Sequence, residues 1–213
     1  INVIDYCRVQ KIPLVYASSS TVYGNLLLGD DESMEIDLLS PYATDKYAME
    51  LYAKTANKLY QLSSVGLRFF NVYGPRQDPG SPYSGVISIF ADRMLKGMEI
   101  VINGGYQTRD FVYVKDVVGT IYQAIVLASR NVVCEASNVL MGKSVTINYL
   151  ADQMMGVVGV EVNKIYQDLS LGDPKQSDGT VEKMVRLFST EVENFTKLKN
   201  GLQETIQYIK SEV

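Results

Sequence analysis

The alternation of short apolar runs with a longer helix-forming segment constrains the fold of this chain more than any other feature. Residues 14–17 form a short apolar run, residues 41–62 are rich in good helix formers, and residues 65–70 read as a second strand. Strand, helix and strand in this order indicate a right-handed parallel crossover. We therefore expect an α/β fold built on a parallel sheet.

The remainder of the chain continues the same alternation. Further helices are expected at residues 1–9, 86–96, 117–129 and 146–157 and over most of 192–213, and further strands at 100–103, 111–114, 137–140 and 164–166. Residues 71–76 and 78–82 predict a long loop rich in Gly and Pro, the sort that folds over a site.

Composition excludes several classes of function. The chain has no histidine, which removes Ser-His-Asp and Cys-His catalysis and most catalytic zinc sites, and we expect no metal. The net charge is −4 and no basic cluster carries interleaved aromatics, so we expect no nucleic-acid partner. No apolar run reaches the length of a membrane span, and two distant cysteines, Cys7 and Cys134, fit a reducing cytoplasm. A small-molecule ligand and acid–base chemistry by Tyr, Lys, Asp or Glu remain.

Tyr42 and Lys46 are the first candidates for that chemistry. They stand four residues apart just after Ser40 and Pro41, so the expected helix carries both side chains on one face. A phenol has an ordinary pKa of about 10, and a neighbouring cation favours its ionised form, which can accept a proton from a hydroxyl. The alternative is an amphipathic surface helix whose tyrosine packs and whose lysine is solvated, because a chain with 15 tyrosines shows this spacing about once by chance.

A second cluster of polar residues follows the first strand. Ser18, Ser19, Ser20 and Thr21 come directly after the apolar run, at the carboxyl end of a strand, where ligands bind in open α/β sheets. A turn that caps its own backbone is the alternative. Ser19 stands at the carboxyl end of the strand that precedes the helix of Tyr42, so the two residues can converge on one sheet edge. These three residues would suit the oxidation of a hydroxyl group: Ser19 would orient its oxygen, Tyr42 would take its proton and Lys46 would stabilise the resulting phenolate. A nicotinamide would accept the hydride.

Five ordered strings carry a resemblance to a known family: YASSSTVYG, SPYATDKYAMELYA, GLRFFNVYGPRQDP, TRDFVYVKDV and GDPKQS. Together they resemble the extended short-chain dehydrogenase/reductase family, and within it the UDP-glucose and UDP-N-acetylglucosamine 4-epimerases. The resemblance implies the C-terminal part of a Rossmann-type parallel sheet with a small α/β substrate-binding domain. Residues 1–75 would belong to the NAD-binding domain, and 76–213 mainly to the UDP-sugar-binding region, with 107–138 returning to the Rossmann domain.

The implied activity is NAD-dependent epimerisation at C4 of a UDP-hexose or UDP-N-acetylhexosamine through a 4-keto intermediate. By resemblance, the catalytic residues are Tyr42, Lys46 and Ser19. The cofactor contacts are Tyr42, Lys46 and Ser18. Ser19 also positions the sugar, and Ser20 takes this role if the alignment shifts by one residue.

The remaining substrate contacts are implied one position at a time. Asn71 and Arg109 match contacts to the diphosphate, Gly85 a close backbone approach near the uracil, and Asp173 an acidic residue near the uridine ribose. Ser177 matches the wall of the sugar pocket, where a small side chain favours N-acetylated hexosamines. The alternatives are hydrogen bonding within the loop for Asn71, a plain turn around Asp173, and for Arg109 a surface ion pair to Asp110 or Asp116.

The sequence also departs from the family pattern. Ser170 stands where many relatives carry an arginine that clamps the diphosphate. The glycine fingerprint of the dinucleotide fold is missing, and at about 30 residues per βαβ unit roughly 100 residues of the family fold are unaccounted for. We therefore expect a part of a longer enzyme, unable to hold NAD alone. Family members commonly form homodimers through the tyrosine helix, and the region of Ala48 and Tyr52 is compatible with that arrangement.

Other activities remain open at this stage. A non-catalytic sugar-nucleotide-binding module, a UDP-glucuronate epimerase or decarboxylase, and an ADP-heptose epimerase all fit parts of the pattern. Nucleotide-sugar 4,6-dehydratases fit less well, because they place Thr-Asp-Glu at the strand end where this chain has Ser19, Ser20 and Thr21.

Overall fold

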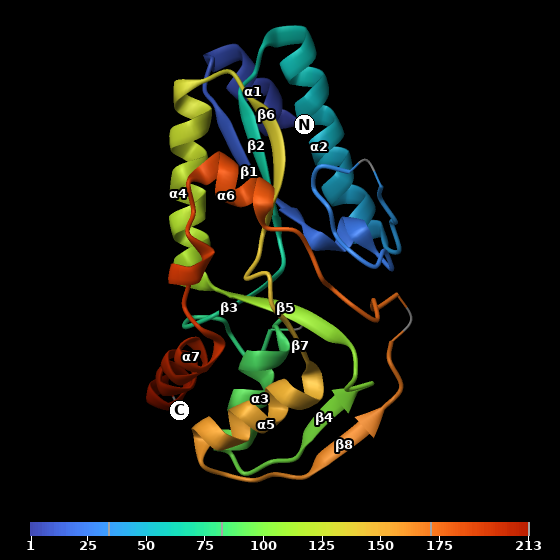
Figure 1. Ribbon diagram of the computed structural model, residues 1–213, viewed down its shortest axis with the longest axis vertical. Helices are drawn as coiled ribbons and strands as arrows, with labels where there is room; N and C mark the ends of the chain where they lie inside the picture. The colour runs from blue at the N-terminus through green and yellow to red at the C-terminus, as the bar shows by residue number, and fades with distance from the viewer. Residues whose placement is uncertain (34, 82, 171, 213) are drawn as a thin grey trace.

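The computed structural model describes residues 1–33, 35–81, 83–170 and 172–212, and its strands fall into two groups, one in the upper half and one in the lower half of the view in Figure 1. One group is a parallel sheet with the order β1-β2-β6, formed by β1 (Leu14–Ser19), β2 (Ser64–Phe69) and β6 (Cys134–Val139). The other contains a sheet of β3 (Asn71–Tyr73), β5 (Thr108–Tyr113) and β7 (Ser144–Thr146), and a pair of β4 (Ile100–Asn103) and β8 (Lys164–Gln167).

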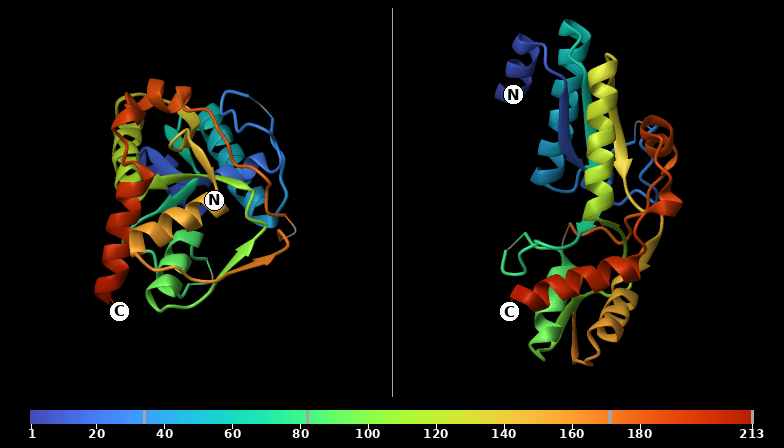
Figure 2. Two further views of the ribbon diagram at one scale, coloured as in Figure 1. Left: turned by 60° about the horizontal axis from the view of Figure 1, so that its bottom comes forward. Right: turned by 90° about the vertical axis from the view of Figure 1, so that its left-hand side faces the viewer.

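Helices surround both groups of strands (Figure 2). Those near the first sheet are α1 (Asn2–Gln10), α2 (Pro41–Tyr60), α4 (Val114–Arg130) and α6 (Glu182–Phe188). Those near the second group are α3 (Val86–Leu95), α5 (Ile147–Val158) and α7 (Leu198–Glu212). Two 3₁₀ turns complete the elements, η1 (Ser20–Tyr23) directly after β1 and η2 (Val192–Asn194) before α7.

The expected parallel crossover is confirmed. β1 and β2 pair in parallel from Leu14 with Ser64 to Ser19 with Phe69, so their carboxyl ends finish at the same edge. Val65 and Leu67 are fully buried in one hydrophobic cluster with Ala124 of α4. Because side chains alternate along a strand, Arg68 points to the opposite face, where it meets α2.

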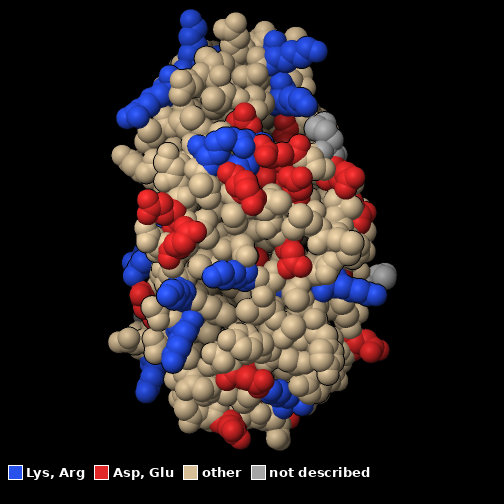
Figure 3. All heavy atoms as spheres, viewed as in Figure 1, with Lys and Arg blue, Asp and Glu red and all other residues tan. Residues whose placement is uncertain are grey.

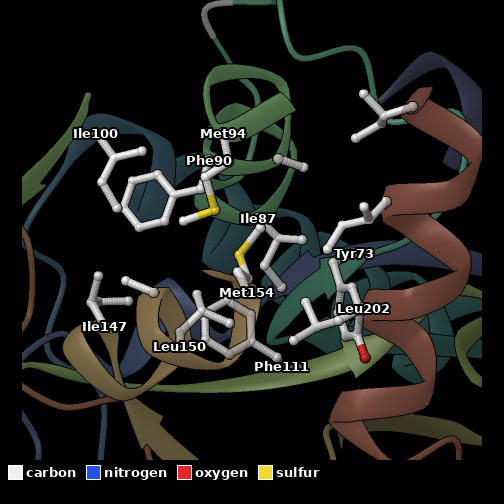
Figure 4. Packing of buried hydrophobic residues seen from close by; sticks show 14 of the residues in the cluster. Tyr73, Ile87, Phe90, Met94, Ile100, Phe111, Ile147, Leu150, Met154 and Leu202 are labelled. Carbon is white, nitrogen blue, oxygen red and sulfur yellow. The ribbon is translucent and has the colours of Figure 1, made fainter. Parts of the chain in front are cut away.

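A second hydrophobic core holds the other end of the molecule together (Figure 4). Tyr73 of β3 lies edge-to-face against Phe111 of β5, with ring centroids 6.3 Å apart. Around this pair the core gathers side chains from α3, β4, α5 and α7: Ile87, Phe90, Met94, Ile100, Ile147, Leu150, Met154 and Leu202. This core fixes β3 and β5 directly below the carboxyl edge of the first sheet.

Several sequence-based expectations need correction. Asn71–Tyr73, expected within a loop, forms β3, because it pairs in parallel with residues 111–113. The strand expected at 111–114 begins at Thr108, and helix α4 begins at Val114. The short elements β7 and α6 were not expected, and the helix expected over 192–213 is interrupted between η2 and α7. Pro82 in the expected loop and Val213 at the expected helix end lie outside the described residues.

Residues 172–181, which we call the strap, run from the second group of strands back to the first sheet. An isolated parallel bridge joins Gly179 of the strap to Gly29. The Gly29 N–H donates to the Asp178 carbonyl at 2.8 Å, and the Thr180 N–H donates to the Gly29 carbonyl at 3.1 Å. The strap is therefore attached to the loop after η1 by backbone hydrogen bonds.

The surface carries charges of both signs. On the face drawn in Figure 3, basic and acidic side chains lie beside one another. Among the ion pairs of the molecule are Arg186 with Glu32 and Lys183 with Glu135. Across the described ranges, no helix combines the length and apolar character that a membrane span requires.

Candidate active site

Helix α2 begins with a well-formed N-terminus that sets Tyr42 at the edge of the sheet. Ser40 is the N-cap, its hydroxyl accepts the Ala43 N–H at 3.1 Å, and Pro41 occupies the first turn. Tyr42 is 54% exposed, so its phenol is accessible. The Lys46 ammonium lies 5.5 Å from the centroid of the Tyr42 ring.

Lys46 is bound to the sheet as well. Its Nζ donates to the carbonyl of Ala17 in β1 at 2.9 Å. The lysine therefore joins the tyrosine-bearing face of α2 to the carboxyl end of β1. An ammonium has three N–H donors, so two remain for a ligand at this edge.

Ser19 ends β1 and caps η1. Its side chain is buried, and its Oγ accepts hydrogen bonds from the Thr21 N–H at 3.2 Å and the Thr21 hydroxyl at 3.0 Å. The self-capping turn considered from the sequence is therefore present. A hydroxyl offers one proton and two acceptor positions, so a Ser19 that accepts twice still has its proton to donate.

Ser18 faces the other way. It is 2% exposed, and its hydroxyl donates to Glu50 Oε1 of α2 at 2.5 Å. Its side chain is committed to a buried network, so the cofactor contact expected of Ser18 is restricted to its main chain.

The strap and η1 enclose a cavity of about 150 Å³. Five of the residues expected to bind substrate line it: Ser20, Asn71, Arg109, Asp173 and Ser177. Gly85 lies outside this cavity. It is the N-cap residue of α3, where an added Cβ would approach Gln77 Nε2 to 3.2 Å.

Arg109 and Asp173 form an ion pair in the wall of this cavity. The guanidinium also donates to the carbonyl of Thr108 at 2.7 Å, and the Arg109 residue is 9% exposed. The two residues come from β5 and the strap, 64 positions apart, and both were expected to contact the nucleotide. A partly buried guanidinium beside a cavity suits a phosphate oxygen.

The surface ion pair considered for Arg109 is wrong. Asp110 is 1% exposed and accepts the Met141 N–H at 2.7 Å, while Asp116 accepts the Thr196 N–H at 2.9 Å. Burial raises the pKa of Asp110 to about 6, against the opposing effect of the backbone N–H groups that it accepts.

Asn71 is held by the same strand. Its Nδ2 donates to the carbonyl of Asp110 at 3.0 Å, which is local hydrogen bonding of the kind considered from the sequence. Because Asn71 also lines the cavity, its amide oxygen remains as a polar group for a ligand.

A buried polar network lies next to the carboxyl end of β1. Arg68 of β2 donates from Nε and Nη2 to the two oxygens of Glu50, at 2.9 and 2.7 Å, and from Nη1 to the Tyr23 hydroxyl at 2.8 Å. Tyr23 in turn donates to Asn138 of β6 at 2.7 Å. Burial raises the pKa of Tyr23, so this phenol stays protonated as a donor.

Sequence reasoning missed some residues of the site. Tyr23, Gln176 and Asp178 also line the cavity. Their signal was available, since Tyr23 lies inside YASSSTVYG, and Gln176 and Asp178 flank Ser177. Ser19, Tyr42 and Lys46 do not themselves line this cavity. The carboxyl end of β1 thus carries a hydroxyl and binds an ammonium that lies beside a phenol, and the next residue, Ser20, lines the cavity that contains the Arg109 guanidinium. These groups fit a nucleotide cofactor and a nucleotide substrate, although the 213 residues contain no Gly-rich turn to cradle a dinucleotide.

Comparison with known proteins gives consistent results. A family model described as the NAD dependent epimerase/dehydratase family matches residues 1–139. A putative UDP-glucose 4-epimerase of Methanocaldococcus jannaschii is 37% identical over 99% of this chain and 68% of its own length. The UDP-N-acetylglucosamine 4-epimerase from Methanobrevibacter ruminantium M1, solved with UDP-N-acetylmuramic acid, is 34% identical with a TM-score of 0.88 and is matched over 100% of this chain and 67% of its own.

A third relative was solved with the cofactor. The UDP-glucuronic acid 4-epimerase from Bacillus cereus, in complex with UDP-glucuronic acid and NAD, is 26% identical with a TM-score of 0.89, over 99% of this chain and 65% of its own. The chain thus spans about two thirds of the length of these relatives. The expected α/β fold is confirmed, and NAD is the cofactor of the matching family. This chain belongs to the NAD dependent epimerase/dehydratase family.

Proposed function

We propose that this chain carries the proton-transfer centre and the UDP-sugar site of an NAD-dependent 4-epimerase acting on UDP-hexoses or UDP-N-acetylhexosamines. The observation that carries the proposal is the position of Lys46, which lies beside the Tyr42 ring and is hydrogen bonded to the carboxyl end of β1, next to Ser19. Ser20, the residue after Ser19, lines the cavity with Arg109 and Asp173, so a UDP-sugar whose diphosphate met Arg109 would have its hexose near the end of β1.

In this proposal Tyr42 is the base. Its phenolate accepts the proton of the C4 hydroxyl while the Ser19 hydroxyl donates a hydrogen bond to the C4 oxygen. The Lys46 ammonium stabilises the negative charge of the phenolate. When bound, NAD supplies the hydride acceptor and donor at C4. After the 4-keto sugar turns over, Tyr42 returns the proton to the oxygen, and the inverted alcohol is released.

Ser177 supports a preference for N-acetylated sugars. It lines the cavity and carries a small side chain, which leaves room for an acetamido group. A UDP-glucuronate epimerase is the second candidate, favoured by the likeness to the Bacillus cereus enzyme.

The proposal extends to organisation and setting. Residues 1–75 and 107–138 form the cofactor-binding part, and the remainder mainly binds the UDP-sugar. The protein works in the cytoplasm as a homodimer through α2, on which Leu51, Tyr52 and Leu59 are exposed.

Replacing Tyr42 by Phe in the protein encoded by the complete reading frame tests the proposal. We expect kcat to fall about 100- to 10,000-fold, with the affinity for the UDP-sugar unchanged, because Tyr42→Phe removes the proton acceptor and keeps the ring. Tyr60→Phe is the matched control, since Tyr60 lies on the same helix and is 56% exposed.

The assay follows product formation from a panel of UDP-glucose, UDP-N-acetylglucosamine and UDP-glucuronate. Retained epimerisation in Tyr42→Phe refutes the assigned base. A wild-type protein that binds UDP-sugars by calorimetry but converts none of them is a binding module instead.

A further inference from the structure

Two successive turns of α2 hold two successive residues of β1. Lys46 donates to the carbonyl of Ala17 at 2.9 Å, and Glu50, four residues later on the same helix face, accepts the hydroxyl of Ser18 at 2.5 Å. The residue after Ser18 is Ser19. Glu50 thus binds the residue directly before Ser19, although its own carboxylate is 8% exposed and has no part in the proposed proton transfer.

The Glu50 carboxylate is itself fixed from the next strand. Arg68 pairs with Ser18 in the register of β1 and β2, and its guanidinium binds both carboxylate oxygens, at 2.9 and 2.7 Å. Such a two-point contact fixes orientation as well as distance. Arg68 also donates to Tyr23 at the end of η1, so the same guanidinium reaches the turn that Ser19 caps.

We propose that Glu50 is a positioning residue that sets the register of α2 against β1, and so holds Tyr42 and Lys46 opposite Ser19. This inference rests on the proposed function. The Glu50 carboxylate is buried and accepts three hydrogen bonds, so moving it away would leave both the carboxylate and the Arg68 guanidinium without their partners. A helix freed from this contact can shift by a fraction of a turn, and misplacement of about 1 Å costs about 100-fold in rate.

Ser18→Ala gives the sharpest test, because it removes the link to the strand and leaves the Glu50–Arg68 pair intact. Ser64→Ala is its matched control. Ser64 lies on the same face of the same sheet, is fully buried, and bonds Cys134 Sγ at 3.8 Å at the opposite end of the strands. Glu50→Gln is the second variant, since it keeps the shape of the side chain and removes its charge.

In the complete protein we expect Ser18→Ala and Glu50→Gln to lower kcat about 10- to 100-fold, with KM for the UDP-sugar within about twofold of wild type. Ser64→Ala is expected to keep the wild-type kcat. Equal losses of kcat in Ser18→Ala and Ser64→Ala would overturn the proposal. Such a result would mean that any substitution of a buried serine in this sheet lowers kcat, wherever it lies along the strands.

A second measurement reads the position of Tyr42 without turnover. With 3-fluorotyrosine at position 42, the fluorine NMR resonance reports the surroundings of the ring at fixed pH. We expect the resonance to move or broaden in Ser18→Ala and Glu50→Gln and to stay in place in Ser64→Ala. If the resonance is unchanged in both variants, the positioning role is refuted, even if the wild-type protein is an epimerase. If the resonance moves, the positioning role is supported, even if the wild-type protein does not catalyse the proposed reaction.

Discussion

Gly24 ends η1 in a backbone conformation that other residues avoid. Its φ is +52°, and an added Cβ would lie 2.1 Å from the carbonyl oxygen of Asp37. The turn that Ser19 opens therefore closes only with glycine at this position. We expect Gly24→Ala to lower the free energy of unfolding by more than about 3 kcal/mol. The backbone near Asp37 must move to make room for the methyl group, and the alanine must also adopt a strained backbone conformation.

Urea denaturation measures this loss of stability, and Gly97→Ala is the control variant. Gly97 also has a positive φ, +66°, but no heavy atom lies within 4 Å of its added Cβ. Strain alone should cost about 1 kcal/mol there. Equal losses of unfolding free energy in Gly24→Ala and Gly97→Ala would contradict the steric explanation for Gly24.

Several residues that line the cavity could be named from the sequence, but the partners of their side chains could not. Ser20, Asn71, Arg109, Asp173 and Ser177 were each named from local strings, and the structure gathers them in one cavity. The partner of Arg109 was sought among its sequence neighbours, whereas folding brings it a carboxylate from the strap. Side-chain direction was equally hidden, because a run of serines does not reveal which hydroxyl faces the core.

At the scale of the element, α2 depends on its first turn. Ser40→Ala removes the cap from the Ala43 N–H, which should cost about 1 kcal/mol of stability. Because the loosened turn carries Tyr42, we also expect kcat to fall severalfold. Thr146→Ala is the control, since Thr146 caps α5 by accepting the Tyr149 N–H at 3.1 Å.

The two cap variants are compared by thermal unfolding and by epimerase assay of the complete protein. If both variants lose similar stability but only Ser40→Ala loses kcat, the first turn of α2 positions Tyr42 for catalysis. A matching fall of kcat in Thr146→Ala would contradict it.

Most elements followed from periodicity, and the exceptions have physical causes. β3 is three residues long and precedes Gly74 and Pro75, so its sequence is typical of a loop, and it becomes a strand only by pairing with β5. The helix is interrupted between η2 and α7, where the Thr196 N–H donates to Asp116 instead of to a carbonyl of its own helix. The two residues are 80 positions apart in the sequence. Long-range partners of this kind leave no local pattern.

At the scale of the whole molecule, Asp110 joins the two groups of strands. It lies on β5 and accepts the N–H groups of Met141 and Lys143 in the link from β6 to β7. Its pKa is raised from 3.8 to about 6, primarily by burial. The folded state therefore favours the protonated form, and the stability from this group is full below about pH 4 and lost as the pH rises through 6.

We expect the unfolding free energy of the wild type, relative to Asp110→Asn, to fall by about 2 kcal/mol between pH 4 and pH 7, because a shift of one pKa unit corresponds to 1.36 kcal/mol and part of the change lies below pH 4. Urea denaturation of both proteins across this range measures the difference. A difference that stays constant with pH would show that Asp110 titrates normally in the folded protein.

The attachment of the strap through Gly29 and Gly179 has a consequence for how this enzyme family can change. Both hydrogen bonds at that bridge involve backbone atoms alone, so the side chain at position 177 can be exchanged without undoing the contact that closes the cavity. In the role proposed for Ser177, substrate preference at this wall is thereby separated from the integrity of the fold. We therefore expect single substitutions at position 177 to change the sugar selectivity while the protein still folds.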